Sequence, residues 1–265
     1  MKRNVILKTI VILAAFYGVF TLCIYLFQDF IFFQPISLQE DYVFPFEQST
    51  EIWLETSDQQ QLNALYFKSP TVAKGIIVYF HGNRGNLSRW GKVHSDFTNR
   101  SYDLLIIDYR GYGKSSGKAS EEGLYEDART AYHWAKQHYA AQDIILYGRS
   151  LGSGVASRLA TEVDAKMLIL ETPFYSIPDA IQRRLPFIYF PFAFRTEFPN
   201  YQHLPKISYP IHVFHGTNDR LVRYSSAIQL QALLRCKECF ISIKGGGHKN
   251  LGDFQSYQEY LDEIL

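Results

Sequence analysis

The sequence predicts an α/β domain with a mostly parallel sheet and one membrane-spanning helix in front of it. Three observations support this prediction. Short apolar runs such as GIIVYF (75–80) and MLIL (167–170) alternate with longer amphipathic segments, which is typical of strands buried on both faces and joined by helices. A long uncharged stretch lies near the start of the chain. The composition, 47% hydrophobic and 20% charged, excludes a disordered or collagen-like chain.

The uncharged stretch runs from Thr9 to Phe27 and would span roughly 28 Å as a helix, close to the hydrocarbon thickness of a membrane. It is apolar on all sides, unlike the usual core helix. Bulky residues follow it at 28–33, where a cleavable signal peptide would have small ones. We therefore expect residues 1–33 to be an uncleaved membrane anchor and residues 34–265 to form one domain.

The charges around this stretch predict its orientation. Lys2, Arg3 and Lys8 lie on its amino side, whereas the first acidic residue, Asp29, lies beyond it. The positive-inside rule then predicts a single-pass protein with a cytoplasmic N-terminus and its folded domain on the outer, periplasmic or extracytoplasmic, side. The total of 27 basic and 26 acidic residues gives no indication of a nucleic-acid partner.

The elements of the domain are expected to follow one another in a regular order. Two strands, at 51–56 and 61–67, would form an antiparallel pair at the amino edge of the sheet. Further strands are expected at 75–80, 103–109, 144–147, 167–170, 211–214 and 240–243. Helices are expected at 86–98, 120–139, 151–161, 224–234 and 253–265.

The strongest motif is Gly-Arg-Ser-Leu-Gly at 148–152, between an expected strand and an expected helix. A G-x-S-x-G motif in this context places its serine on a sharp turn whose neighbours must be small, which predicts Ser150 as a nucleophile. A second G-x-S-x-G occurs at 113–117, in a glycine-rich loop before the expected helix cap Ser120. We therefore favour Ser150 over Ser115.

A serine needs a base to take its proton and an acid to orient that base. Asp219 lies in the loop after the strand at 211–214, and His248 follows three glycines after the last strand. Ligands of open α/β sheets bind at such strand ends. The order Ser150, Asp219, His248 predicts a catalytic triad, with Glu171 as the alternative acid because it follows the strand at 167–170.

Two backbone N–H groups are expected to form an oxyanion hole. Leu151 directly follows the predicted nucleophile, and Asn83 lies in HGNRGN (81–86) after the strand at 75–80. The histidines show no metal-ligand spacing, so we expect neither a metal nor a cofactor. Cys236 and Cys239 follow a helical segment, which favours two ordinary thiols or one local disulfide over a redox or zinc site.

The stretch at about 174–209 interrupts the alternation of strands and helices. It is rich in proline and aromatic residues, notably LPFIYFPFAFRTEFP (185–199), and is expected to form a short cap over the strand ends without a strand of its own. The cap would line a pocket, dip toward the membrane or pack over the core. If it meets lipid, charged residues at Phe192 and Phe194 should weaken membrane binding.

With these motifs the chain resembles the α/β-hydrolase superfamily, in particular membrane-anchored serine hydrolases with an HGN loop and a G-x-S-L-G elbow, the abhydrolase-domain type. The matching stretches are YFHGNRGN (79–86), DYRGYGKSSG (108–117), YGRSLGSG (147–154), HGTNDRLV (215–222) and GGGHKN (245–250). The resemblance extends from about residue 51 to the end. It implies the same roles for Ser150, Asp219 and His248 as the residues themselves indicate.

These observations predict a membrane-tethered serine hydrolase that cleaves carboxylic esters or thioesters, with a small-molecule or lipid acyl substrate, through an acyl-enzyme. A peptidase of the serine aminopeptidase type would use the same triad and stays an alternative. A catalytically inactive binding module on the cell surface is the other. Because His248 must be neutral to act as a base, activity is predicted to fall as the pH drops through roughly 6–7.

Overall fold

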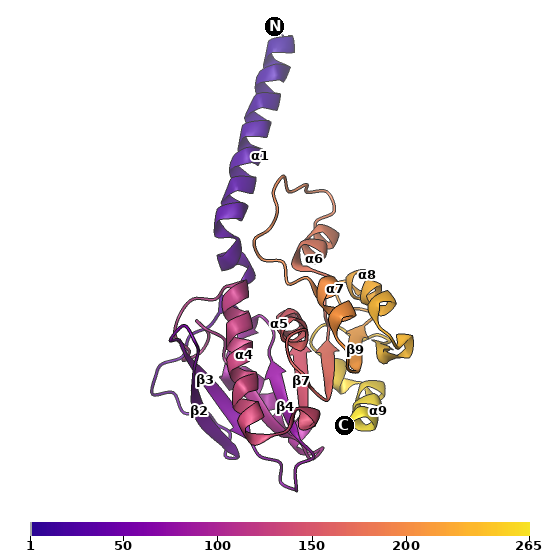
Figure 1. Cartoon of the computed structure of the whole chain (residues 1–265). Coiled ribbons are helices and arrows are strands. Elements are labelled where there is room, and N and C mark those ends of the chain that lie inside the picture. The colour runs from indigo at the N-terminus through magenta and orange to yellow at the C-terminus, as the bar shows by residue number, and fades with distance from the viewer. Residues whose placement is uncertain (1) are drawn as a thin grey trace.

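The computed structural model describes residues 2–265 and consists of one long helix standing on a layered α/β domain (Figure 1). The long helix, α1 (Lys2–Phe32), contains the whole predicted apolar run and continues past it. Within Asn4–Phe32 the mean hydropathy reaches 2.5, and few of the side chains there are buried. Length and composition therefore both fit a membrane span.

The domain is built on an eight-stranded sheet in the order β10-β9-β8-β7-β4-β6-β3-β2. Neighbouring strands from β10 to β6 are parallel, whereas β3 is antiparallel to both β6 and β2. The predicted parallel sheet with an antiparallel pair at its amino edge is confirmed. The strands are β2 (Ser49–Glu55), β3 (Gln61–Phe67), β4 (Ile76–Phe80), β6 (Asp103–Ile107), β7 (Ile144–Arg149), β8 (Met167–Glu171), β9 (Ile211–Gly216) and β10 (Phe240–Ile243).

Helices cover both faces of this sheet (Figure 1). The helices α4 (Glu121–His138) and α5 (Leu151–Ala160) pack on one face, and α3 (His94–Thr98) and α9 (Gln255–Ile264) pack on the other. Each face carries its own cluster of buried apolar side chains. Strands that are apolar on both sides require such cover, which explains the uninterrupted apolar runs in the sequence.

Two of the predicted helices are less regular than expected. The segment at 86–98 divides into α2 (Leu87–Trp90), a 3-10 turn and α3. The break occurs where the Phe46 ring packs against Gly91, so closely that a Cβ on Gly91 would lie 2.4 Å from it. The segment at 224–234 is α-helical only in α8 (Tyr224–Ala227) and continues as a 3-10 helix to Leu233.

The stretch between β8 and β9 contains no strand among the described residues, as predicted, but it contains a helix that the sequence analysis missed. This helix, α6 (Ile177–Arg184), begins after Ser176, whose side chain accepts a hydrogen bond from the Asp179 N–H at 3.2 Å. Pro178 lies in its first turn. Both features are helix-start signals that the sequence contains. A short second helix, α7 (Asn200–His203), follows.

The residues between these two helices, 185–199, form a loop that rises beside the lower part of α1 (Figure 1). We call this segment the cap loop. The Arg195 N–H donates a hydrogen bond to the Gln28 side-chain oxygen at 2.6 Å, and Gln28 is fully buried. The rings of Tyr25 and Phe192 meet edge to face, with centroids 5.3 Å apart. The cap loop and the carboxyl-terminal half of α1 therefore pack as one unit.

This packing changes which cap-loop side chains are available to lipid. Phe194 is 9% exposed because its ring lies 5.8 Å from the ring of Phe32, so it is unsuited to the lipid contact that the sequence suggested. Phe187 and Tyr189 are instead 99% and 73% exposed. Large apolar groups left exposed beside an apolar helix are consistent with a lipid environment.

Candidate active site

Ser150 occupies the turn between β7 and α5 in a strained backbone conformation. Its φ is 52° and its ψ is −115°, values that a residue with a Cβ rarely adopts and that cost about 1–3 kcal/mol. Its N–H donates to the Glu171 carbonyl at 2.9 Å. A Cβ on Gly152 would lie 1.9 Å from the Phe80 carbonyl oxygen, and a Cβ on Gly148 would lie 2.4 Å from that of Gly152. Both glycines of the motif are therefore sterically required.

The structure brings Ser150, His248 and Asp219 together from the ends of three strands. The Ser150 hydroxyl lies 2.9 Å from His248 Nε2, and His248 Nδ1 lies 2.7 Å from an Asp219 carboxylate oxygen. The other carboxylate oxygen accepts the N–H groups of Leu221 and Val222 at 2.8 and 2.9 Å. A carboxylate fixed in this way favours the tautomer in which Nδ1 carries the proton, leaving Nε2 free to accept the serine proton.

His215 is a neighbour of this group that the sequence analysis did not single out. It is fully buried, and its Nε2 lies 3.0 Å from the Val222 carbonyl and 3.5 Å from the Asp219 carboxylate. Burial lowers the pKa of His215 to about 4, so it is neutral at pH 7. It lies four residues before Asp219, at the end of β9, and its position in HGTND was the available signal.

Glu171, the alternative acid, has other partners. One of its carboxylate oxygens accepts the Tyr147 hydroxyl at 2.7 Å, and the other lies 3.2 Å from the Arg149 guanidinium. Its position at the end of β8 places it beside the elbow, but the contact to His248 is made by Asp219. The geometry thus favours Asp219 as the acid of the group.

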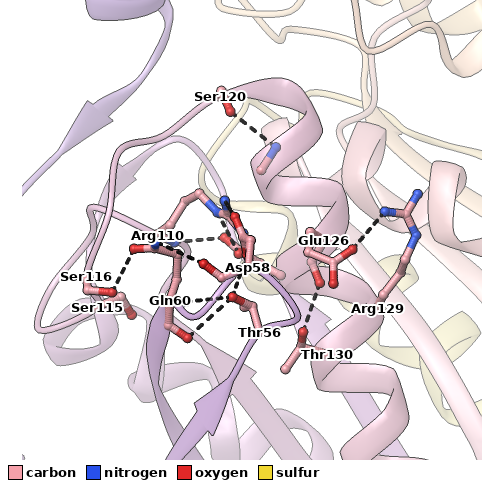
Figure 2. Close-up of polar contacts among 12 residues, drawn as sticks. Thr56, Asp58, Gln60, Arg110, Ser115, Ser116, Ser120, Glu126, Arg129 and Thr130 are labelled. Atoms are coloured by element: carbon pink, nitrogen blue, oxygen red, sulfur yellow. Dashed lines mark hydrogen bonds and ion pairs between the residues drawn. The ribbon is translucent and has the colours of Figure 1, made fainter.

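Ser115, in the second G-x-S-x-G motif, is bonded within its own loop. Its hydroxyl donates to the Asp108 carbonyl at 2.7 Å and accepts the Asn63 N–H at 2.9 Å. Figure 2 shows the same loop beside Arg110, whose guanidinium binds the Asp58 carboxylate at 2.7 Å. The Ser115 hydroxyl thus both donates and accepts a hydrogen bond within the loop. Its proton is directed to a backbone carbonyl and not to a histidine that could act as a base.

The two residues predicted to supply the oxyanion N–H groups line one cavity together with Ser150. Leu151 is the first residue of α5, so its N–H has no partner within the helix. Asn83 is held by its side chain, whose oxygen accepts the Tyr112 hydroxyl at 2.9 Å and the Gln34 N–H at 3.1 Å. Among residues 2–265, neither the Leu151 nor the Asn83 N–H donates to a protein acceptor. Both are free to bind an oxyanion.

Asn83 also connects the site to α1. Its side-chain amide donates to the Phe32 carbonyl at the end of α1. Directly after the helix, β1 (Gln34–Pro35) pairs in parallel with β5 (Arg84–Gly85), the residues that follow Asn83. The end of the apolar helix is therefore part of the framework of the site.

Two cavities open at Ser150, and they differ in character. The apolar cavity, about 350 Å³, lies between α1, α6 and the loop after β9, and its polar lining residues are Asn83, Ser150, Arg184 and Thr196. Its apolar lining residues are Ile31, Phe32, Leu151, Phe174, Ile177, Ala180, Ile181, Leu221 and Val222. The basic cavity, about 290 Å³, contains His248 and is lined by Gln34, Gly82, Asn83, Arg84, Arg89, Trp90, Arg149, Leu221 and Lys249.

No cluster of three or more His, Cys, Asp or Glu suited to a metal ion occurs in residues 2–265. Cys236 and Cys239 are joined by a disulfide, one of the two states expected for them. The pair directly precedes β10 and lines neither of the Ser150 cavities.

Comparison with known proteins finds similarity to α/β hydrolases over part of the sequence. Residues 71–196 match the family model described as serine aminopeptidase, S33. The sequence is 27% identical to alpha/beta hydrolase domain-containing protein 17C of Xenopus tropicalis over 77% of this chain and 64% of that protein. It is 27% identical to protein 17B of the same series from Homo sapiens, over 79% of this chain and 71% of that one.

Solved structures agree on the fold. The Pyrococcus furiosus esterase Pf2001 superposes with a TM-score of 0.70 at 16% identity, over 88% of this chain and 96% of that one. Est1E of Butyrivibrio proteoclasticus, solved with ferulic acid bound, superposes with a TM-score of 0.64 at 17% identity, over 80% and 97% of the two chains. The chain therefore has the α/β-hydrolase fold, preceded by one long apolar helix.

Proposed function

We propose that this protein is a membrane-anchored serine hydrolase that cleaves carboxylic esters or thioesters of acyl groups through an acyl-enzyme. The observation that supports this most directly is the chain of hydrogen bonds from Ser150 through His248 to Asp219, at 2.9 and 2.7 Å. A hydroxyl bonded to a histidine that is in turn oriented by a buried carboxylate is the arrangement that serine nucleophiles require.

In this mechanism Ser150 attacks the acyl carbonyl while His248 takes its proton. The N–H groups of Leu151 and Asn83 stabilise the negative charge that develops on the carbonyl oxygen. His248 then returns the proton to the departing alcohol or thiol, and the acyl group stays on Ser150 as an ester. Water, activated by His248, releases the carboxylic acid and restores the serine. Asp219 orients the ring throughout and stabilises its charged form.

The proposal also includes the membrane anchor, the bounds of the hydrolase domain and the orientation of the chain in the membrane. Residues 1–33 are the membrane anchor, and residues 34–265 are the hydrolase domain with a cap at about 174–209. The basic residues before the apolar run support a cytoplasmic N-terminus and a hydrolase domain on the outer side. A membrane-impermeant maleimide tests the orientation if Lys118 of a Cys23→Ala variant is replaced by cysteine. Labelling in intact cells is expected, and labelling only after lysis would reverse the orientation.

The nucleophile is tested with a fluorophosphonate probe on the full chain in detergent. The full chain is needed because Ile31 and Phe32 of α1 line the apolar cavity. Wild type and Ser115→Ala are expected to label, and Ser150→Ala is expected not to. Labelling that survives in Ser150→Ala would disprove the assignment. A folded wild-type protein that never labels would favour the inactive binding module.

The family description makes a peptidase the second candidate. An aminopeptidase needs an anionic group to bind the free amino terminus of its substrate. None of the described residues that line the two cavities at Ser150 is Asp or Glu, and one cavity is basic. We therefore rank the esterase first. Faster cleavage of an alanyl anilide than of a matched neutral ester would reverse this order.

A further inference from the structure

The basic cavity holds three cations without acidic partners. Arg84, Arg89 and Lys249 line it, and among residues 2–265 none of them lies within ion-pair distance of a carboxylate. The fourth cation, Arg149, is different because Glu171 neutralises it at 3.2 Å. Most other arginines of the domain do have a carboxylate partner. An excess of positive charge is thus concentrated beside the nucleophile.

One of these cations is held in place rather than free in solvent. The Arg89 guanidinium lies over the Trp90 ring, 4.9 Å from its centroid, and one of its nitrogens lies 3.5 Å from the Arg84 carbonyl. Stacking of this kind restrains the side chain and leaves its remaining N–H donors available. Arginine donors in a fixed plane are well suited to phosphate or carboxylate oxygens.

The position of His248 indicates which part of a substrate enters this cavity. In the mechanism above, His248 returns its proton to the departing oxygen or sulfur, so the leaving group must lie on the His248 side of Ser150. His248 lines the basic cavity and not the apolar one. The acyl chain then occupies the apolar cavity beside α1, and the leaving group occupies the basic cavity.

We propose that the basic cavity selects a leaving group that carries a negative charge, a phosphate or a carboxylate, close to the scissile ester or thioester. This inference rests on the proposed function and specifies its substrate class: an amphiphile with an apolar acyl chain and an anionic alcohol or thiol part. In the overall reaction water adds across the acyl bond, giving the carboxylic acid and the anionic alcohol or thiol. No oxidant, reductant or cofactor is required.

The test uses two soluble substrates that differ by one charge: the octanoyl ester of 4-nitrophenol and the octanoyl ester of 5-hydroxy-2-nitrobenzoate. The full-length protein in neutral detergent is assayed for kcat/KM on both. The wild type is expected to prefer the anionic ester by about tenfold, since each exposed cation contributes roughly 1.5- to 5-fold. This preference is expected to decrease at high salt because screening weakens it.

The variants Arg84→Gln, Arg89→Gln and Lys249→Gln are each expected to lower the preference, and the triple variant is expected to abolish it. Lys118→Gln is the matched control, since Lys118 is exposed and lines neither cavity. Lys118→Gln should leave fluorophosphonate labelling and the rates on both esters within about twofold, and labelling of Ser150 is expected to persist in the triple variant because its side chains lie outside the triad. A wild type that cleaves the neutral ester without preference, or a preference unchanged in the triple variant, would overturn the inference while leaving the proposed function intact. Loss of all labelling in the wild type would overturn both.

A second pair of substrates distinguishes a lipid from a soluble source of the anion. Octanoyl glycerol phosphate and monooctanoyl glycerol are compared below their micellar concentrations, and their long-chain counterparts are compared in neutral vesicles. The charge preference is expected in both settings, and a larger preference in vesicles would identify a lipid headgroup. If the cations only bind anionic membranes, the triple variant would lose binding to anionic vesicles with an unchanged preference in solution, which contradicts the proposal.

Discussion

The two Gly-x-Ser-x-Gly segments of this chain share a pattern but not a chemistry. Ser150 follows a parallel strand, adopts a strained φ of 52°, and offers its hydroxyl to His248. Ser115 lies in a loop, is 9% exposed, and uses its hydroxyl to join Asn63 to Asp108. The comparison shows that the spacing of glycines permits a tight turn, whereas the neighbouring strand ends decide whether its serine has a base.

Each serine also has an aspartate–histidine pair nearby, which provides the sharpest test. Asp219→Asn should reduce kcat/KM for an octanoyl ester by about 10³–10⁴-fold, because the amide no longer fixes the ring tautomer. The matched control is Asp108→Asn, since Asp108 lies 3.3 Å from His81 but that histidine does not contact Ser115. Steady-state kinetics on both variants, with melting curves to show folding, are expected to separate them by at least about 100-fold. Equal losses would contradict the assignment of Asp219.

The glycines of the two motifs should differ in how strictly they are required. A Cβ at Gly152 would meet the backbone carbonyl of Phe80 at 1.9 Å, so Gly152→Ala forces α5 away from β4. We expect it to lower the free energy of unfolding by about 3 kcal/mol or more and to abolish probe labelling. A Cβ at Gly117 would meet the flexible end of Gln60 at 2.5 Å and make ordinary contact with the Arg110 side chain at 3.4 Å. The φ of +83° predicts a cost of about 1–2 kcal/mol for Gly117→Ala. Thermal unfolding in detergent measures both; a milder effect at Gly152 would show that the elbow can relax.

The same contrast explains what the sequence could and could not predict. The strands of the sheet were predictable within a few residues because burial on both faces leaves an uninterrupted apolar run, as in Ile76–Phe80. Ser150, Asp219 and His248 could be named because each lies in the segment that follows a strand, and the structure joins them by hydrogen bonds. Local pattern does not show which distant segments meet, so the break at Gly91, caused by the Phe46 ring, was not predictable.

Long-range packing also explains why several residues of the site could not be identified from the sequence. Ile31 and Phe32 belong to the apolar helix that the sequence assigns to the membrane, yet they line the cavity at Ser150. The sequence did not indicate a role for Arg149. In the structure its side chain pairs with Glu171 beside the nucleophile. The helix α6 was missed for a different reason: its start signals were present, but the prolines and aromatic residues around it obscured them.

Acidification should change the free energy of unfolding in opposite directions through the titratable groups near Ser150 and those near Ser115. On the Ser150 side, burial lowers the pKa of both His203 and His215 to about 4, against about 6.5 in an unfolded chain. The unfolded state binds these protons first, so their contribution to stability is complete above pH 6.5 and is lost as the pH falls toward 4. On the Ser115 side, burial raises the pKa of Asp127 to about 6, so its contribution increases on acidification.

We expect His203 and His215 to lower the free energy of unfolding between pH 7 and pH 5, and Asp127 to oppose this loss. Chemical unfolding at both pH values measures it. His203→Gln should make the difference smaller, and Asp127→Asn should make it larger. If neither variant changes the difference, these groups do not determine the acid response.

The smallest expected effect concerns Ser115 and its neighbour, which Figure 2 shows side by side in the loop. Ser115→Ala leaves the buried Asn63 N–H without its acceptor, which should lower the free energy of unfolding by about 1–2 kcal/mol. Ser116 makes two similar hydrogen bonds, to Gln61 and Gln60, but is exposed, so water can replace its hydroxyl. Ser116→Ala should therefore cost less than about 0.5 kcal/mol. Both variants should keep full fluorophosphonate labelling at 20 °C, because the loop acts through folding alone. A loss of labelling in folded Ser115→Ala would show instead that this second motif communicates with the elbow.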